Sequence, residues 1–207
     1  MKAAVIVFPG INRERDMART LKLVSGREPV MVWHADTALP AGTDLAVIPG
    51  GFSYGDYLRC GAIAKFSPMM QSVIEFAKSG GKVLGICNGF QILCESGLLP
   101  GVLLRNSQQQ FVCKNVFIKE AAGDTCEALK IPVAHGEGRY FADDKTLEEL
   151  EMHRQIIYRY CDDKCAVTRE SNPNGAIHNI AGICNKERNV YGMMPHPERA
   201  CSNALGN

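Results

Sequence analysis

The sequence lacks a long hydrophobic run and an excess of charge of either sign. No stretch approaches the roughly 18–20 consecutive apolar residues of a membrane-spanning helix, so we expect no membrane segment. The chain carries 23 Lys and Arg against 22 Asp and Glu, a formal net charge of +1, so its charge does not favour nucleic acid or an acidic membrane as partner. The apolar segment at residues 3–8 is too short for the core of a signal peptide, and we therefore expect a cytoplasmic protein.

The cysteines also lack the spacing of a metal site or a disulfide framework. The chain has nine of them, and no two form a Cys-x-x-Cys unit. Cys161 and Cys165 are the nearest pair, but neither a second pair nor a suitable histidine follows them. The sequence therefore predicts no metal on this chain, and it does not favour disulfides.

What is present is an alternation of short apolar runs and helical spacing, which predicts an α/β fold. Strands are expected at residues 3–8, 29–33, 45–48 and 82–86, and helices around residues 17–24, 68–77 and 87–93. Such βαβ units form a mostly parallel central sheet and bind ligands at the carboxyl ends of the strands. The second half is predicted to add β-rich segments at 111–118, 131–134, 156–160 and 180–184 and one helix at 146–155. No linker divides the chain, so we expect a single domain over residues 1–207.

The segment Gly85-Ile86-Cys87-Asn88-Gly89 has the Gly-x-nucleophile-x-Gly form of a strand-to-helix elbow. The two glycines relieve crowding around a residue on a sharp turn. Cys87 would then project above the sheet, next to the N-terminal amides of a helix, whose partial positive charge favours a thiolate. A buried cysteine beside ordinary turn glycines explains the five residues equally well.

A cysteine nucleophile needs a proton shuttle, and His196 is the candidate. It lies between Pro195 and Pro197, and in extended chain Glu198 would point the same way and orient the imidazole ring. Taken alone, an exposed turn histidine explains this motif better.

The pair Gly50-Gly51 ends another strand, where its backbone amides could stabilise an oxyanion. The three features together predict one site at the edge of the sheet.

These same residues carry a family resemblance. The segments 85–91, 49–56 and 193–199 resemble class I, triad-type glutamine amidotransferases. More narrowly, the segments 8–12, 55–59, 105–106 and 134–139 resemble the family of glutaminase subunits of phosphoribosylformylglycinamidine synthase, an enzyme of purine biosynthesis. The resemblance extends from residue 3 to about residue 205 and implies a flavodoxin-like three-layer fold.

The resemblance implies a role for each matching residue. It makes Cys87 the nucleophile, His196 the general base and later acid, and Glu198 the residue that orients His196. It further implies an oxyanion hole and a glutamine pocket. The oxyanion hole would use amides near Gly51 and Asn88, and the pocket would include Gln91, His135 and Gly136. A helix-surface role for Gln91 and a shape-only role for His135 remain open.

The resemblance also implies partners. Glutamine is the substrate, and the ammonia passes to a large synthetase subunit that converts formylglycinamide ribonucleotide to its amidine, with a small bridging subunit in the multi-chain form. No phosphate-binding Gly-rich motif occurs in this chain, so no cofactor is expected on it, and ATP and Mg²⁺ are expected on the synthetase subunit. Residues 52–66, with Tyr54, Asp56, Tyr57 and Arg59, are expected near the docking face or the ammonia exit.

Three alternatives stay open at this point. The chain could be the glutaminase of another pathway, such as pyridoxal phosphate, imidazole glycerol phosphate or anthranilate synthesis. It could instead be an elbow-cysteine protein of redox sensing or protein repair, in which His196 with Glu198 would be unexpected, or a catalytically silent binding module. The family usually continues beyond the motif around His196, whereas this sequence ends at Asn207, so contacts of such a C-terminal segment are not predicted.

Overall fold

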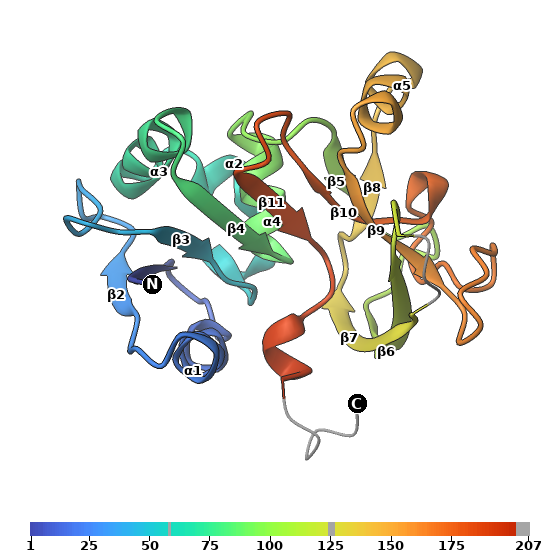
Figure 1. Ribbon diagram of the computed structural model, residues 1–207, viewed down its shortest axis with the longest axis horizontal. Helices are drawn as coiled ribbons and strands as arrows, with labels where there is room; N and C mark the ends of the chain where they lie inside the picture. Colours follow the sequence, from blue (N-terminus) through green and yellow to red (C-terminus); the bar gives the residue numbers. More distant parts are fainter. Residues whose placement is uncertain (58, 124–126, 202–207) are drawn as a thin grey trace. The chain divides into compact units, whose positions relative to one another are not determined.

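A computed structural model describes residues 1–57, 59–123 and 127–201, which form two compact units (Figure 1). The first unit comprises Met1–Leu99 with Asn189–Gly192, and the second comprises Pro100–Arg188 with the described residues from Met193 on. Every helix within the described ranges is too short or too polar to span a bilayer. Whether the whole chain acts as a single domain stays a prediction.

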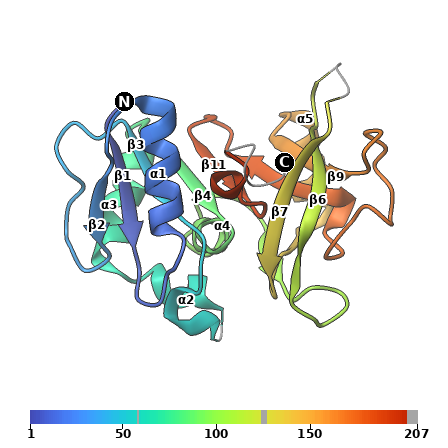
Figure 2. The same ribbon diagram turned by 90° about the horizontal axis from the view of Figure 1, so that it is seen from below.

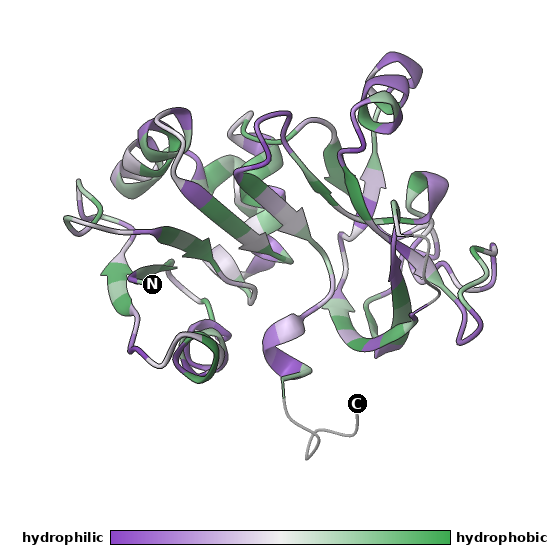
Figure 3. Ribbon diagram, viewed as in Figure 1, coloured by the Kyte–Doolittle hydropathy of each residue, from purple (hydrophilic) through white to green (hydrophobic). Residues whose placement is uncertain are grey.

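The first unit is an α/β sheet in the strand order β2-β1-β3-β4-β11. Its strands are β1 (Ala3–Val7), β2 (Val30–Trp33), β3 (Leu45–Ile48), β4 (Lys82–Ile86) and β11 (Val190–Met193), the last of which ends in the second unit. The pairs β1–β2, β1–β3 and β3–β4 are all parallel. In Figure 3, β3 and β4 are largely hydrophobic, as expected for strands covered on both faces.

Helices cover both faces of this sheet because the chain moves in opposite directions from its centre. The helices are α1 (Glu14–Ser25), α2 (Cys60–Ala64), α3 (Pro68–Lys78) and α4 (Asn88–Glu95), with a short 3₁₀ turn η1 (Ser53–Asp56). In the strand order, β2 lies on one side of β1, and β4 lies on the opposite side of β3. Because both crossover connections are right-handed, the helices α1 and α3 within them cover opposite faces of the sheet (Figure 1). Figure 2 shows α1 lying across β1 and β3.

The ends of these helices follow local signals only in part. Gly26 ends α1 in a left-handed conformation, and its N–H donates to the carbonyl of Lys22 at 2.8 Å. Ser67 and Pro68 begin α3 as predicted, but the Ser67 side chain makes no capping hydrogen bond. The Ser67 carbonyl instead accepts from the N–H of Met70 at 3.0 Å.

The second unit is antiparallel, with the strand order β10-β9-β6-β7. Its strands are β6 (Val112–Glu120), β7 (Leu129–His135), β9 (Ile156–Cys161) and β10 (Ile180–Cys184), with a separate pair β5 (Val102–Leu104) and β8 (Arg139–Phe141). It also contains α5 (Asp144–Met152) and the 3₁₀ turns η2 (Ile177–Asn179) and η3 (Pro197–Arg199). Asp143 caps α5 by accepting from the N–H of Thr146 at 2.8 Å, which starts the helix two residues before the predicted position.

The structure confirms the strands and helices predicted from apolar spacing, and it adds short ones that the spacing missed. The strands β5 and β8 have three residues each, too few to show an alternation. Strand β11 contains Gly192, which weakens a strand pattern. A side chain there would overlap the rings and methyl groups of Phe90 and Leu99, so glycine is required for packing.

One cysteine differs from the expectation. Cys165 is disulfide-bonded, although the scattered spacing of the cysteines did not favour a bridge. Among the described residues, the cysteines that carry a reduced thiol are Cys60, Cys87, Cys94, Cys113, Cys161, Cys184 and Cys201. Spacing along a chain cannot show which thiols meet in a folded structure.

Close packing of α4 against β3 predicts a specific sensitivity at Gly89. A Cβ atom at this position would overlap the carbonyl oxygen of Ile48. We expect Gly89→Ala to lower the free energy of unfolding by about 3 kcal/mol or more, measured by urea denaturation. Gly97→Ala is the matched control, because nothing lies within 4 Å of its Cβ and only its φ of 73° is unfavourable for alanine. The control should lose about 1 kcal/mol, and equal losses would contradict the packing argument.

Candidate active site

Cys87 occupies a sharp strand-to-helix turn, as predicted. It joins β4 to α4 with φ 53° and ψ −105°, a conformation that non-glycine residues rarely adopt. Both flanking glycines lie where a side chain has no room. A Cβ at Gly85 would come within 2.7 Å of the carbonyl group of Gly89, and one at Gly89 would overlap Ile48. The elbow geometry is therefore confirmed, while the role of Cys87 as nucleophile stays a prediction.

The turn after β3 lies at the same edge of the sheet as Cys87. The parallel register pairs Ile48 with Gly85, so the residues that follow both strands leave the sheet side by side. Gly51 has φ 134°, and a Cβ there would lie 2.6 Å from the backbone nitrogen of Asn12. Asn88 is the first residue of α4, where a backbone N–H has no acceptor within the helix. Their predicted use as oxyanion donors suits this placement and remains a prediction.

Gln91 lies one helical turn beyond Cys87 and is buried rather than on the helix surface. Its Oε1 atom accepts from the Nδ2 of Asn88 at 2.7 Å and from the thiol of Cys60 at 3.1 Å. The surface role considered for Gln91 is therefore wrong. Contact with glutamine stays a prediction, and the Oε1 atom already has two donors in this structure.

His196 and Glu198 form a buried pair in the second unit. The Nδ1 atom of His196 lies 2.5 Å from Oε1 of Glu198, and the two side chains are 3% and 0% exposed. A ring that donates its Nδ1–H to a carboxylate carries its lone pair on Nε2, the form that a general base needs.

The backbone brings this pair together differently from the expectation. The extended chain expected there is wrong, because Pro197–Arg199 form the 3₁₀ turn η3, closed by the Arg199 N–H donating to the His196 carbonyl at 3.1 Å. His196 itself is anchored through its N–H, which donates to the carbonyl of Pro132 at 2.9 Å. Proline on both sides restricts the backbone, and the turn, not strand alternation, brings Glu198 to the ring.

His135 ends β7 and is held by a buried amide network. Its Nδ1 lies 3.1 Å from Oδ1 of Asn106, and its Nε2 lies 3.4 Å from Nδ2 of Asn174. The amide of Asn106 also donates to the carbonyl of His135 at 2.8 Å, and its Oδ1 accepts from the N–H of Gly138 at 3.0 Å. A neutral ring with its proton on Nδ1 satisfies both amide partners. The shape-only role is thus supported by contacts, and a direct role of His135 or the adjacent Gly136 toward glutamine stays a prediction.

Burial lowers the pKa of His135 to about 4, with a further lowering from the charge of His196. His135 is therefore neutral at physiological pH. The two asparagines that hold it, Asn106 and Asn174, were not predicted as functional residues. Asn106 occurs in one of the segments of family resemblance, and Asn174 lies in a turn-forming Asn-Pro-Asn-Gly run, but neither signal indicates a contact across the fold.

The predicted site residues divide between the two units. The first unit holds Gly51, Cys87, Asn88 and Gln91 at one sheet edge. The second unit holds His135, Gly136, His196 and Glu198. That all of them act on one substrate stays a prediction.

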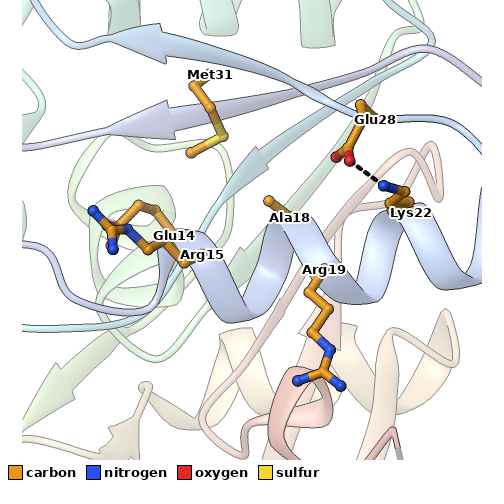
Figure 4. A pocket seen from close by; sticks show the side chains of 7 residues that line it. All are labelled: Glu14, Arg15, Ala18, Arg19, Lys22, Glu28 and Met31. Atoms are coloured by element: carbon orange, nitrogen blue, oxygen red, sulfur yellow. Dashed lines mark hydrogen bonds and ion pairs between the residues drawn. The ribbon is translucent and has the colours of Figure 1, made fainter.

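A surface pocket of about 470 Å³ lies beside α1 and β2 and contains none of these residues (Figure 4). It is lined by Glu14, Arg15, Ala18, Arg19, Lys22, Glu28 and Met31. Lys22 and Glu28 pair with one another across it. Among the described residues, no group of three or more potential metal ligands is gathered anywhere in the fold.

Comparison with known proteins gives consistent similarities. Residues 1–207 match the CobB/CobQ-like glutamine amidotransferase domain family. The phosphoribosylformylglycinamidine synthase subunit PurQ of Bradyrhizobium diazoefficiens is 58% identical over 214 residues, covering 100% of this chain and 92% of that protein. The protein of the same name from Gloeobacter violaceus is 53% identical, with the same coverage.

Solved structures agree with the sequence comparison. A chain of the structure of PurLQS from Thermotoga maritima is 40% identical with a TM-score of 0.84, covering 100% of this chain and 92% of that chain. A glutamine amidotransferase from Thermotoga maritima, 16% identical, has a TM-score of 0.58 and covers 97% of this chain and 78% of that chain, which shows the shared fold alone. The α/β fold is thus that of glutamine amidotransferases.

The buried state of His135 predicts a pH dependence of stability. With a pKa of about 4 when folded and about 6.5 when unfolded, the residue binds more protons in the unfolded chain between these values. Stability therefore falls as the pH is lowered through this window, by about 3 kcal/mol in total from this residue.

His135→Gln should remove about 2–3 kcal/mol of the loss between pH 7 and pH 4.5, because glutamine can donate and accept but does not titrate. Urea denaturation at both pH values measures this difference. The same substitution at the exposed His153 is the matched control for the loss of one histidine. An unchanged pH dependence in His135→Gln would contradict the assignment of a neutral, buried His135.

Proposed function

The chain belongs to the family of CobB/CobQ-like glutamine amidotransferase domains, and from this membership we propose that it is the glutaminase subunit of a phosphoribosylformylglycinamidine synthase. The observation that carries the proposal is 58% identity over the whole chain to a protein of that name. The elbow at Cys87 and the buried pair of His196 and Glu198 support it with the groups that amide hydrolysis requires.

In the proposed reaction Nε2 of His196 takes the thiol proton of Cys87, and the sulfur attacks the side-chain amide carbon of glutamine. The resulting tetrahedral oxyanion is stabilised by backbone N–H groups near Gly51 and Asn88. His196 delivers a proton from Nε2 to the leaving nitrogen, so that ammonia departs and a γ-glutamyl thioester remains on Cys87. Nε2 of His196 then takes a proton from water, whose oxygen attacks the thioester carbon, and His196 returns this proton to the departing sulfur as glutamate is released.

Glu198 orients the histidine in this scheme. Its carboxylate accepts from Nδ1, which fixes the tautomer and stabilises the imidazolium that forms in each half-reaction. Gln91, His135 and Gly136 would shape the glutamine pocket. Since both amide partners of His135 come from the protein itself, its contribution would be to hold the backbone around Gly136 in place.

The ammonia is passed to an ATP-dependent synthetase subunit that makes formylglycinamidine ribonucleotide, with a small third subunit bridging the assembly. A solved PurLQS structure that contains a similar chain supports these partners. The proposal places ATP and Mg²⁺ on the synthetase subunit and no cofactor on this chain. It places the assembly in the cytoplasm.

Replacement of the nucleophile tests the proposal in the reconstituted complex. We expect Cys87→Ser to lower glutamine-dependent synthesis by at least about 10³-fold, because the hydroxyl at this site lacks the acidity of a thiol. Synthesis from added ammonia should be unchanged, because that reaction bypasses Cys87. Formation of the amidine product and of glutamate, followed in parallel, measures both rates.

Cys113→Ser is the matched control, since Cys113 is an exposed free thiol and should be replaceable without loss. Retention of glutamine hydrolysis in Cys87→Ser would overturn the assignment of the nucleophile. Loss of both glutamine-dependent and ammonia-dependent synthesis would indicate a damaged complex. Vigorous glutamine hydrolysis without any product in the presence of a competent synthetase would indicate a glutaminase of another pathway.

A further inference from the structure

The side chain of Asn88 joins the start of α4 to a surface segment of the first unit. Its Oδ1 accepts from the N–H of Ser53 at 2.9 Å, and its Nδ2 donates to Oδ1 of Asp56 at 3.0 Å. The same Nδ2 also contacts Gln91 at 2.7 Å and the sulfur of Cys60 at 3.3 Å. Asn88 directly follows Cys87, so any shift of these partners acts on the residue next to the reactive sulfur.

The backbones behind these contacts are also closely packed. A Cβ at Gly61 in α2 would lie 2.9 Å from the carbonyl oxygen of Gln91 in α4. Figure 2 shows α2 beyond the carboxyl end of β1 and beside α4. Because packed backbones leave no space to absorb a displacement, α2 and the start of α4 have to move together.

The surface segment, residues 52–57 and 59–66, is held in an unfavourable backbone conformation. Tyr54, Asp56 and Arg59 all have φ between 54° and 57°, where non-glycine side chains are crowded. A few contacts hold it there. The Tyr54 N–H donates to the carbonyl of Pro9 at 2.7 Å, and the Arg59 Nε donates to Glu95 at 2.9 Å. Strain that persists only through such contacts is typical of switch regions.

The surface segment presents large apolar side chains to solvent. Phe66 is 80% exposed and Tyr57 is 74% exposed, and Phe52 and Ile63 are also exposed. Four exposed apolar side chains on one short segment suit a surface that a partner covers. The segment follows β3 at the edge of the sheet where Cys87 ends β4, and ammonia formed at Cys87 has to leave toward the subunit that consumes it. Under the proposed function, the synthetase subunit is the partner that fits this position.

We propose that Asn88 is a positioning residue through which the synthetase subunit, docked on the surface segment, adjusts the turn at Cys87 and so accelerates glutamine hydrolysis. This inference rests on the proposed function. Docking moves Ser53 and Asp56, the Asn88 carboxamide follows them, and the first N–H groups of α4 shift relative to the Cys87 sulfur. The coupling explains how docking of the synthetase subunit can restrict the release of ammonia to the assembled enzyme.

Removal of the Asp56 carboxylate tests the coupling. Asp56→Gly deletes the acceptor for Asn88, and glycine tolerates the φ of 57° at this position. Asp56→Asn keeps an oxygen that can accept the same hydrogen bond and tolerates this φ. Glutamate release is measured for the lone subunit and for the complex with the synthetase subunit, the small subunit, nucleotide substrate and ATP.

We expect Asp56→Gly to lower the stimulation by the complex by about tenfold more than it lowers the lone-subunit rate, and binding of the synthetase subunit is measured in parallel. Asp56→Asn should restore the stimulation. Phe66→Ala should instead weaken binding of the synthetase subunit by about tenfold, whereas Phe141→Ala, a half-exposed aromatic of the second unit, is the matched control without effect.

Two results would overturn the inference. One is unchanged stimulation in Asp56→Gly, and the other is an equal loss in the lone subunit and the complex, which would mean a purely structural role for Asp56. Failure of the proposed function gives a different result, because wild-type protein would then show no glutamate release that depends on the synthetase subunit. If wild type is stimulated and every variant behaves like it, only the inference fails.

Discussion

The close approach of α4 to the end of β3 is the constraint on which the first unit depends. Gly89 places the helix backbone against the Ile48 carbonyl, where no side chain fits, and this approach leaves the chain a single residue in which to turn from strand to helix. Cys87 is that residue, and it takes a strained conformation as a result. The strain persists because the buried apolar side chains of α4, among them Phe90, Ile92 and Leu93, hold the helix in place. The strained geometry at Cys87 is thus a consequence of packing elsewhere.

The second unit buries polar side chains in hydrogen-bonded pairs and networks. His196 and Glu198 are out of water and paired at 2.5 Å. His135 is buried and neutral, with an amide partner at each ring nitrogen. In a low-dielectric surrounding such networks are strong when complete and destabilising when a member is missing, so each one specifies a single arrangement. A neutral His135 adds no positive charge near His196.

Local patterns in the sequence predicted those features of the fold that depend on neighbouring residues alone. The glycines around Cys87 and the apolar runs of β1, β3 and β4 follow from sterics and burial, so they could be predicted. Contacts between residues that are distant in the sequence could not be predicted in this way. The network of Asn106 and Asn174 joins positions far apart in the chain, and so do the bonds from Asn88 to Ser53 and Asp56. The pairing of His196 with Glu198 was expected for the wrong reason, because prolines on both sides permit a 3₁₀ turn as readily as an extended segment.

The two polar clusters differ in a way that indicates which part of the site can be adjusted. The network around His135 is buried on every side, and Asn106 and Asn174 are wholly inaccessible to solvent. The cluster around Asn88 includes a half-buried carboxylate, a sulfur that is a weak acceptor, and a strained surface segment. Opening the first requires loss of several buried hydrogen bonds at once, whereas the second can rearrange with water replacing its outer member. Of these two clusters, the one around Asn88 has contacts that can exchange with solvent, and our proposal therefore places the response to a partner subunit next to Cys87.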